Sequence, residues 1–430
     1  MGGKAAAVVG VIERVIGLAR IAPAVSKNGL LNMQKSIEAL QLAYITGFLL
    51  VILVNQLPGQ SSLDSVARAP VDVNILFNYY TQEGDHSAVT GGIGTEELTD
   101  YDTRIIVLIP VDSASRLSAE AGFNTYSSAS TDRIDSRMSS ASSSDIRASV
   151  QLGWEQDRPE SGQSYSWGMG GSVESDYLSM NLHGSYYQPV KEEQSALFID
   201  AQAFFGRWVL YFPEELRDTV QPFITTDRRF SYHLNVQYQH ILNRRTTLAV
   251  STGVSYQQGL LSTPFHRVYF PGEELPRIER LPGRRWQWPI SLRLHYFAGG
   301  SLVTRFFYRY YLDGFGIQAH SLELELPMKL NPSFTFIPVY RYHRQIASHY
   351  FQPYLGHQPD ATFYSSDFDL SGFNSHKMGV GMQFSPARRW RWPGRKSRGE
   401  LTSISLRVAH YRRSDGLRAW MGSMMWGWAF

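Results

Sequence analysis

The chain lacks cysteine, has only a small excess of charge of one sign, and contains no hydrophobic run long enough for a spanning helix. Among its 430 residues, 41 Lys and Arg stand against 38 Asp and Glu, a formal net charge of +3. Without cysteine there is no disulfide framework, which is compatible with export through an oxidising compartment. The nearly balanced charge gives no reason to expect nucleic acid as a partner. A mean hydropathy of −0.25 excludes a bundle of membrane-spanning helices.

One apolar run stands out, at residues 43–54, with Lys35 before it and a polar turn after it. A core of about a dozen apolar residues after a basic residue is typical of a secretory signal, whereas a spanning helix needs about 20. We expect residues 33–60 to be a signal peptide and residues 1–32 to be an upstream extension from a start codon assigned too early. Residues 61–430 would then form the exported domain. The alternative is an inner-membrane anchor.

After residue 70 the dominant pattern is a strict alternation of apolar and polar side chains. Clear examples are residues 71–79, 146–155, 178–186, 230–239 and 290–296. Segments of about 10 residues with this period are long enough for tilted strands to cross an outer membrane. Aromatic side chains gather at the segment ends, where transmembrane barrels carry their interfacial girdles.

The connections between these segments alternate in length. We expect long loops near residues 82–101, 126–143, 209–227, 258–285 and 346–373, with short turns between them. Bacterial barrels place short turns in the periplasm and long loops outside. The sequence therefore predicts an all-β fold, a transmembrane antiparallel up-and-down β-barrel of about 16 strands, with about 14 as the alternative, in the bacterial outer membrane. The difference depends partly on whether residues 361–369 form an extra strand or part of a loop.

The final segment has its own pattern. Large apolar residues alternate with smaller ones at Trp420, Met424, Trp426, Trp428 and Phe430. This pattern predicts a closing strand with one face toward lipid. It resembles the C-terminal signal of bacterial outer-membrane barrels, with Trp426, Trp428 and Phe430 at its core, and so implies the barrel-assembly machinery and the lipid bilayer as partners. The alternative is an edge strand of a soluble sandwich.

The first long loop is the richest in groups that could bind a ligand. Residues 79–102 contain six carboxylates, one histidine and four glycines. Oxygen ligands on a backbone bent by glycine suit a hard cation such as Ca²⁺, and a histidine would admit a transition metal. We take Asp85, His86, Glu96 and Glu97 as candidate ligands of a divalent cation. The alternative is a solvated acidic loop in which the glycines only make turns.

Residues 82–98, QEGDHSAVTGGIGTEEL, resemble the hallmark of a family of uncharacterised bacterial outer-membrane proteins known only as a domain of unknown function. The serine-rich residues 127–144 and the segment RYYLDGFGIQAH at 309–320 are also similar to it. Members of that family are expected to be barrels and are often encoded near FMN-transferase-like and thioredoxin-like proteins and a small lipoprotein. The resemblance implies an envelope system linked to redox or metal handling, with the lipoprotein or a periplasmic redox protein as partner. It supplies no catalytic residues.

Several charged side chains alternate with the apolar face and should therefore point into the lumen. They are Arg293, Arg305, Arg309, Arg341, Arg407, Glu323 and Glu325. Charges at membrane depth must pair or face water. They could form a bracing lattice of arginine and glutamate, or a constriction that favours anions.

These patterns predict a pore, or a transport or structural component of an envelope system, and not an enzyme. One alternative is an assembly or binding platform with a plugged lumen. Another is an outer-membrane hydrolase with a serine and a histidine on adjacent strands. His320 cannot act on Ser321, because neighbours on a strand point to opposite faces. Other pairings of serine and histidine stay open.

Overall fold

The computed structural model describes most of the expected exported domain. The described residues are 69–127, 144–190, 194–211, 213, 215, 224–387, 390–391 and 399–430. The expected signal peptide and upstream extension lie outside them, as do residues 128–143 of the serine-rich segment, so these predictions stay predictions. No helix in the described part of the chain is long and apolar enough to cross a membrane.

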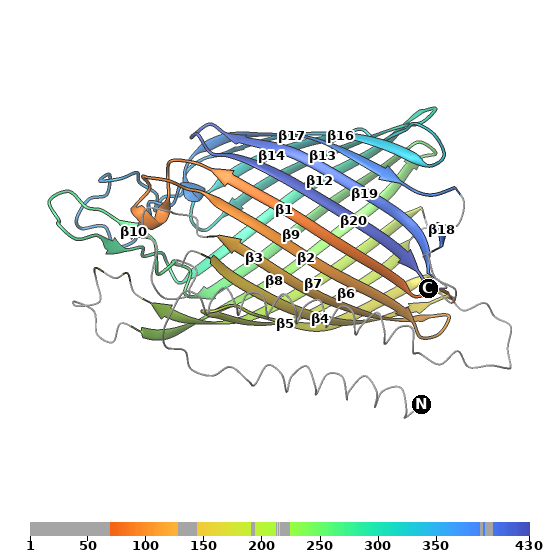
Figure 1. The fold of residues 1–430 in the computed structure, drawn as a ribbon, viewed down its shortest axis with the longest axis horizontal. Coiled ribbons are helices and arrows are strands. Elements are labelled where there is room, and N and C mark those ends of the chain that lie inside the picture. The colour runs from red at the N-terminus through yellow and green to blue at the C-terminus, as the bar shows by residue number, and fades with distance from the viewer. Residues whose placement is uncertain are drawn as a thin grey trace, which may run out of the picture. The chain divides into compact units, whose positions relative to one another are not determined.

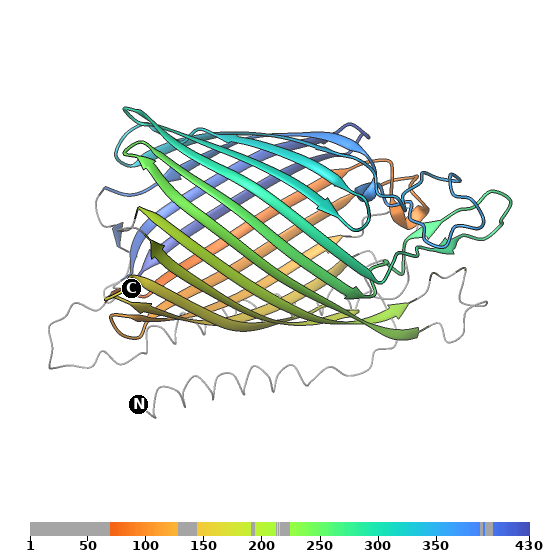
Figure 2. The ribbon, with the colours of Figure 1, turned by 180° about the vertical axis from the view of Figure 1, so that it is seen from behind.

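Sixteen strands form one closed antiparallel barrel (Figures 1 and 2). The strands of the wall are β1 (Asp72–Glu83), β2 (Leu98–Pro110), β3 (Ser115–Ser127), β4 (Ser144–Arg158), β5 (Gln163–Val173), β6 (Tyr177–Val190), β7 (Ser195–Tyr211), β8 (Ile224–Asn243), β9 (Thr246–Gly259), β12 (Arg284–Gly299), β13 (Leu302–Asp313), β14 (Gln318–Glu325), β16 (Phe334–Gln345), β17 (Phe373–Phe384), β19 (Glu400–Arg413) and β20 (Arg418–Ala429). This confirms the predicted fold and its larger strand number.

Four further pieces are only two residues long and do not add strands to the wall. β15 (Met328–Lys329) continues the line of β14 and pairs with the same neighbours, β13 and β16. β18 (Trp390–Arg391) pairs with the start of β19. β10 (Arg267–Val268) and β11 (Arg277–Ile278) pair only with each other, in the long loop between β9 and β12.

The barrel closes between β1 and β20. Trp428 lies opposite Val73, and Trp426 lies opposite Ile75. At the end of this seam the Val71 amide donates to the Phe430 carbonyl at 3.0 Å, and the Phe430 amide donates to the Val71 carbonyl at 2.9 Å. The predicted closing strand is confirmed. The role of these residues as an insertion signal stays a prediction.

The outer face of the wall carries the apolar members of the alternating pattern. Exposed examples are Val150, Met169, Met180, Leu182, Leu234, Val250, Ile290, Leu322, Met378, Val380 and Leu406. In lipid every backbone polar group must be paired within the protein, and a closed barrel achieves this. A closed barrel with such an exterior is an integral protein of a bacterial outer membrane.

The predicted long loops all lie at one end of the barrel, together with three short turns at 174–176, 314–317 and 414–417. The other end has short turns, with the longer connection 385–399 among them. The long loops face outside by the rule for bacterial barrels. Residues 361–369 are not a wall strand, because they belong to the loop between β16 and β17.

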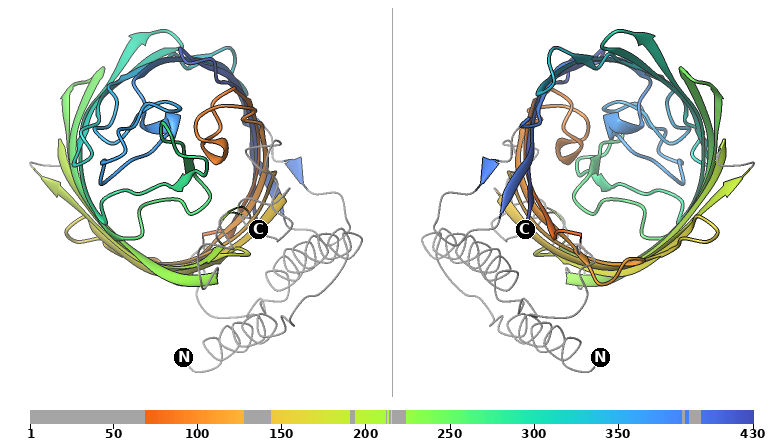
Figure 3. Two further views of the ribbon diagram at one scale, coloured as in Figure 1. Left: turned by 90° about the vertical axis from the view of Figure 1, so that its left-hand side faces the viewer. Right: turned by 90° about the vertical axis from the view of Figure 1, so that its right-hand side faces the viewer.

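Three of the long loops fold together, and we call them the cap. L1 (84–97) contains the 3₁₀ turn η1 (Ala88–Thr90), L5 (260–283) contains β10 and β11, and L7 (346–372) contains the 3₁₀ turn η3 (Phe368–Leu370). Seen down the barrel, all three lie within the outline of the strand ring (Figure 3). Val268, Phe270 and Tyr364 form an apolar core between L5 and L7, with Ala361 packed against it.

Candidate functional site: a loop cap above a charged lumen

L1 is attached to L5 by a buried arginine and a glycine. The Arg267 guanidinium, in β10, donates to the Val89 carbonyl of L1 at 2.7 Å. It also pairs with the Glu215 carboxylate, with one contact at 3.0 Å. Gly91 has φ +83°, and a Cβ there would lie 2.6 Å from the ring of Tyr269 in L5. Glycine is therefore required both for the backbone conformation and for the close approach of the two loops.

L1 is attached to L7 by ring stacking and a second glycine. The His86 ring stacks on Phe368 of η3, with ring centroids 3.8 Å apart and an interplanar angle of 2°. Its Nδ1 shares a hydrogen bond of 3.1 Å with the Gly92 carbonyl. A Cβ on Gly92 would lie 2.7 Å from the Ser366 carbonyl of L7. These two glycines of L1 do more than make turns, since each admits a neighbouring loop.

Arg413, at the end of β19, holds L7 to the wall. Only 5% of its side chain is exposed. The guanidinium donates to the Asp369 carboxylate at 2.5 Å and to the Phe368 carbonyl at 2.6 Å. It also donates to both carboxylate oxygens of Asp415 and lies 3.9 Å from the centre of the Phe373 ring. One arginine thus joins η3, the last external turn and the barrel wall.

L5 and L7 meet at a cluster of three titratable side chains. His266 Nδ1 of L5 lies 3.5 Å from Glu279 Oε1 of L5 and 3.8 Å from Asp367 Oδ2 of L7. Burial lowers the pKa of His266, but the carboxylates outweigh this effect, Glu279 most, and raise it to about 9. Burial raises the pKa of Glu279, while His266 and hydrogen-bond donors outweigh it, so the pKa lies below its usual value.

The described part of the chain contains two groups of three residues that could bind a metal ion. Within each group, the three ligand atoms lie within 4.8 Å of one another. One is His266, Glu279 and Asp367, and the other is Asp145, Glu174 and Asp176. The second group already engages Tyr126, Ser175 and Arg147 as donors or ion-pair partners. The sequence did not single out either group, because each includes one residue from a different part of the chain, Asp367 in the first group and Asp145 in the second.

The four cation ligands expected in L1 belong to neither group. His86 faces Phe368 and its own loop. Glu96 accepts a hydrogen bond from Gln82 at 3.2 Å. Burial, with Asp369 as the main charged contributor, raises the pKa of Glu96 to about 7. Binding of a cation by Asp85, His86, Glu96 and Glu97 stays a prediction.

The predicted lumenal charges divide into a paired and an unpaired set. Glu325 pairs with Arg305 at 2.9 Å and with Arg407 at 3.2 Å, while Lys377 lies 3.7 Å from Glu323. In contrast, Arg293, Arg309 and Arg341 form no ion pair with any described carboxylate. The buried Nε of Arg309 has no hydrogen-bond partner. The paired residues could form the expected bracing lattice, and the three unpaired arginines could form the expected constriction that favours anions.

The other half of the lumen holds ion pairs that the sequence analysis missed. Arg104 pairs with Asp102 and Glu120, Arg116 with Glu155, and Arg147 with Glu174. Alternation along the strands would have placed Arg104, Asp102, Glu120, Arg116 and Glu155 on the inward face. Glu174 lies in the turn after β5, where this period does not apply.

Two serine–histidine pairs in the described wall face inward. In the first, Ser255 Oγ of β9 shares a hydrogen bond of 2.7 Å with His233 Nδ1 of β8. In the second, Ser321 Oγ of β14 shares a hydrogen bond of 2.8 Å with His343 Nδ1 of β16. The other ring nitrogen lies 3.4 Å from the Gln345 side-chain oxygen, so no carboxylate orients this ring among the described contacts. His320 points to the opposite face and shares a hydrogen bond with the Tyr308 hydroxyl. His320 and Ser321 are therefore not partners, as expected.

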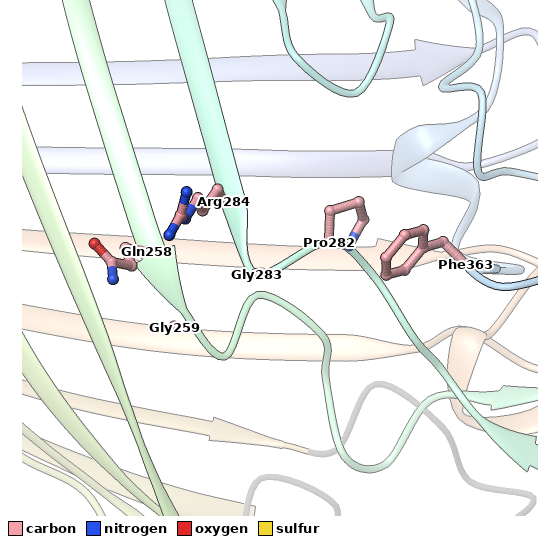
Figure 4. Close-up of a pocket in the computed structure, with 6 residues that line it drawn as sticks. All are labelled: Gln258, Gly259, Pro282, Gly283, Arg284 and Phe363. Atoms are coloured by element: carbon pink, nitrogen blue, oxygen red, sulfur yellow. The ribbon is translucent and has the colours of Figure 1, made fainter.

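A surface pocket lies where L5 leaves and rejoins the wall (Figure 4). It has a volume of about 410 Å³ and is lined by Gln258, Gly259, Pro282, Gly283, Arg284 and Phe363. Gln258 and Arg284 sit at the facing ends of β9 and β12. Arg284 is its one charged group, so it offers no catalytic constellation.

Solved structures of bacterial outer-membrane proteins match the fold at low identity. A mutant of the ferric enterobactin receptor PfeA from Pseudomonas aeruginosa has a TM-score of 0.42 and 10% identity, over 80% of this chain and 53% of that chain. The present chain thus spans about half of that receptor. OccK1 (OpdK) from the same organism has a TM-score of 0.38 and 8% identity, over 84% of this chain and 98% of that chain. A bacterial polysaccharide outer membrane secretin has a TM-score of 0.45 and 10% identity, over 85% of this chain and 99% of that chain.

No curated protein matches the sequence. The model of DUF3570, a family described as protein of unknown function, matches residues 109–416, which is more than half of the chain. The segment 309–320 lies within the match, whereas the L1 motif at 82–98 precedes it. The chain belongs to the DUF3570 family.

Proposed function

We propose that the protein is an outer-membrane channel whose external mouth is covered by the cap. The observation that carries this proposal is the combination of a water-facing charged lumen with loops tied across one end. Half of the Arg407 side chain and 43% of the Arg305 side chain are exposed on the lumenal face of the wall. Charges that face water within a barrel line a path for polar solutes.

The unpaired arginines favour an anionic solute. Arg293, Arg309 and Arg341 stand on three wall strands, β12, β13 and β16, and lack carboxylate partners among the described residues. A guanidinium remains charged at any physiological pH and presents a planar set of donors to carboxylate or phosphate groups. Arg305 and Arg407 are less available to a solute anion, because both already pair with Glu325.

Single-channel recording in planar bilayers tests this proposal. Arg341 and Arg344 lie on the same strand, but Arg341 points into the lumen and Arg344 points outward, which gives a matched pair. We expect Arg341→Glu to shift the reversal potential in a KCl gradient toward cation selectivity, and Arg344→Glu to leave it unchanged. Equal behaviour of the two variants would refute an anion path along this wall.

A platform with a plugged lumen is the second candidate, and the cap favours it. If the folded barrel is silent, and stays silent after L7 is released by substitution of Arg413, the channel proposal fails. Heat-modifiable gel mobility establishes that the barrel is folded in each sample. A stable complex with a small lipoprotein or a periplasmic redox protein would then support the platform.

We further propose that the barrel serves an envelope system linked to redox or metal handling. This step rests on the family resemblance described above. Unchanged redox balance and metal content in a deletion strain would remove its support.

A further inference from the structure

We propose that His266, Glu279 and Asp367 form a site for a divalent first-row transition-metal ion that joins L5 to L7. This inference goes beyond the channel function and does not depend on it. The three ligand atoms come from two loops far apart in sequence, and all lie within 4.8 Å of one another. Glu279 is 5% exposed, so the centre of the cluster is shielded from water.

The spacing of the three groups suits an ion better than direct hydrogen bonds. His266 Nδ1 lies 3.5 and 3.8 Å from the two carboxylate oxygens, beyond the roughly 2.7–2.9 Å of charge-assisted hydrogen bonds. Ligands placed about 2.0–2.2 Å from one tetrahedral ion are separated by roughly 3.3–3.5 Å. The 3.5 Å distance already matches this value and the 3.8 Å distance needs a small contraction, while the two carboxylate oxygens lie within 4.8 Å of each other.

His266 Nδ1 makes no hydrogen bond, although two carboxylates lie near it. The atom is buried. An unsatisfied buried polar nitrogen costs about 1–3 kcal/mol, so such a group in a folded loop calls for an explanation. A metal ion between His266, Glu279 and Asp367 would satisfy the nitrogen and neutralise both carboxylates.

The carboxylates are held in place by donors outside the cluster. The Ser365 hydroxyl donates to Glu279 Oε1 at 2.5 Å, and the Thr263 amide donates to Glu279 Oε2 at 2.7 Å. The Asp369 amide donates to Asp367 Oδ1 at 2.9 Å, which leaves Oδ2 directed toward His266. Outer donors of this kind orient ligands and keep carboxylates ionised in metal sites.

The donor set selects a class of ion. One imidazole and two carboxylates suit Zn²⁺, Mn²⁺, Fe²⁺ or Co²⁺. Ca²⁺ requires six to eight oxygen ligands, which this cluster does not supply. Three protein ligands leave further coordination positions for water or for an external group.

Metal titration of the purified, chelator-treated full-length barrel tests the site. We expect one equivalent of Zn²⁺ or Mn²⁺ per chain by calorimetry, and much weaker binding of Ca²⁺. The isosteric variants Glu279→Gln and Asp367→Asn should weaken binding at least tenfold. The control Asp85→Asn removes an exposed carboxylate of the L1 site expected from sequence and should leave binding unchanged.

Two results would overturn the proposal. One is a wild-type protein that binds neither ion, in which case the cluster is a protonated histidine held by two carboxylates. The other is a site that Asp85→Asn abolishes and Glu279→Gln does not. Should the variants disturb the cap, Co²⁺ added to the wild-type barrel gives a second readout. Visible absorption bands of a four- or five-coordinate nitrogen–oxygen site are then expected, and an unchanged aqua-ion spectrum would contradict the site.

A separate observation concerns the outer face near the loop end of the wall. Arg207 of β7 lies directly opposite Arg228 of β8, and Arg412 of β19 lies directly opposite Arg418 of β20. All four are exposed, and they share their faces with outward apolar residues such as Leu178. None forms an ion pair with a described carboxylate.

Like charges directly opposite on neighbouring strands destabilise a sheet unless an anion lies between them. We infer that each arginine pair binds a phosphate group of an outer-leaflet lipid. At this end of the wall the lipid headgroups lie alongside, and two guanidiniums can bind one phosphate through several N–H donors. Arg412 is two residues from His410, whose ring contacts Trp420 at 4.8 Å. The pair thus lies beside an aromatic contact of the kind found at the membrane interface.

Native mass spectrometry with bisphosphorylated lipid A, and with the same lipid after removal of its phosphates, tests this inference. We expect the barrel to retain the phosphorylated lipid preferentially, and Arg412→Gln with Arg418→Gln to reduce that retention several-fold. Arg344→Gln removes one outward arginine that has no arginine opposite and serves as the control. Equal retention of the two lipids, or an equal loss in the control, would contradict the inference.

Discussion

Replacement of Arg413 by methionine should open the cap without unfolding the barrel. Methionine retains most of the packing against Phe373 but removes every donor of the guanidinium. The Asp415 carboxylate, with 11% of its side chain exposed, then loses its cation. Arg413 and Asp415 both remain with the wall when L7 opens, so the energy that bears on opening comes from the hydrogen bond to the Phe368 carbonyl of L7, about 1.5–3 kcal/mol for a charged donor. Asp369 is 75% exposed, so its share is small.

We therefore expect cap opening to become easier by about 2 kcal/mol, which corresponds to an open population roughly 30-fold larger. The chain has no cysteine, so a single Ser366→Cys substitution provides a probe at a position that is 1% exposed. When closing is faster than labelling, the rate of maleimide reaction follows the open population. The same probe in an Arg344→Met background should label at the original rate. A change of less than twofold in Arg413→Met would refute the assignment of Arg413 as the main attachment of L7.

Three further predictions use the same barrel. Burial and acidic neighbours raise the pKa of Glu96 to about 7. The stabilisation of the closed cap by protonated Glu96 is therefore present below about pH 4.5 and is lost as the pH rises through about 7. After correction for ionisation of the thiol, the labelling rate at Ser366→Cys should increase over that range, and the increase should vanish in Glu96→Gln. Gly91→Ala should favour opening by about 1–3 kcal/mol, because its φ is positive and the added Cβ clashes with a tyrosine ring, and the labelling rate should increase accordingly. Gly272→Ala is the control: its φ is +80° and nothing lies within 4 Å of the added Cβ, so its effect on the same labelling rate should be smaller and purely conformational. Trp428→Ser should lower the yield of heat-modifiable barrel in membranes because it weakens the closing seam, and a normal yield would count against the insertion signal.

The wall could be predicted from sequence because a strand repeats every two residues and a barrel uses both faces. That period placed Arg305, Glu325 and Arg407 on one face, and the structure pairs them through ion pairs. The alternation of long and short connections then gave the strand number. Both signals are local, so each can be read without knowledge of the partner strand.

The cap could not be predicted in the same way. The contact between Arg267 and the Val89 carbonyl joins residues 178 positions apart, and no periodic pattern marks either residue. The glycines of L1 gave a partial signal, but the sequence indicated turns and not the ring of Tyr269. His266, Glu279 and Asp367 are ordinary loop residues until L5 and L7 come together.

The interlocking of L1, L5 and L7 also limits how this surface can change over time. External loops that do not touch can each accept substitutions and insertions without regard to the others. Here a larger residue at Gly92 would meet Ser366, and a change at Asp369 would remove one of the contacts between L7 and Arg413. Variation in one cap loop therefore has to be matched in another, so among relatives these positions should change together. The protein would evade a phage or an antibody that recognises the cap only by coordinated substitutions.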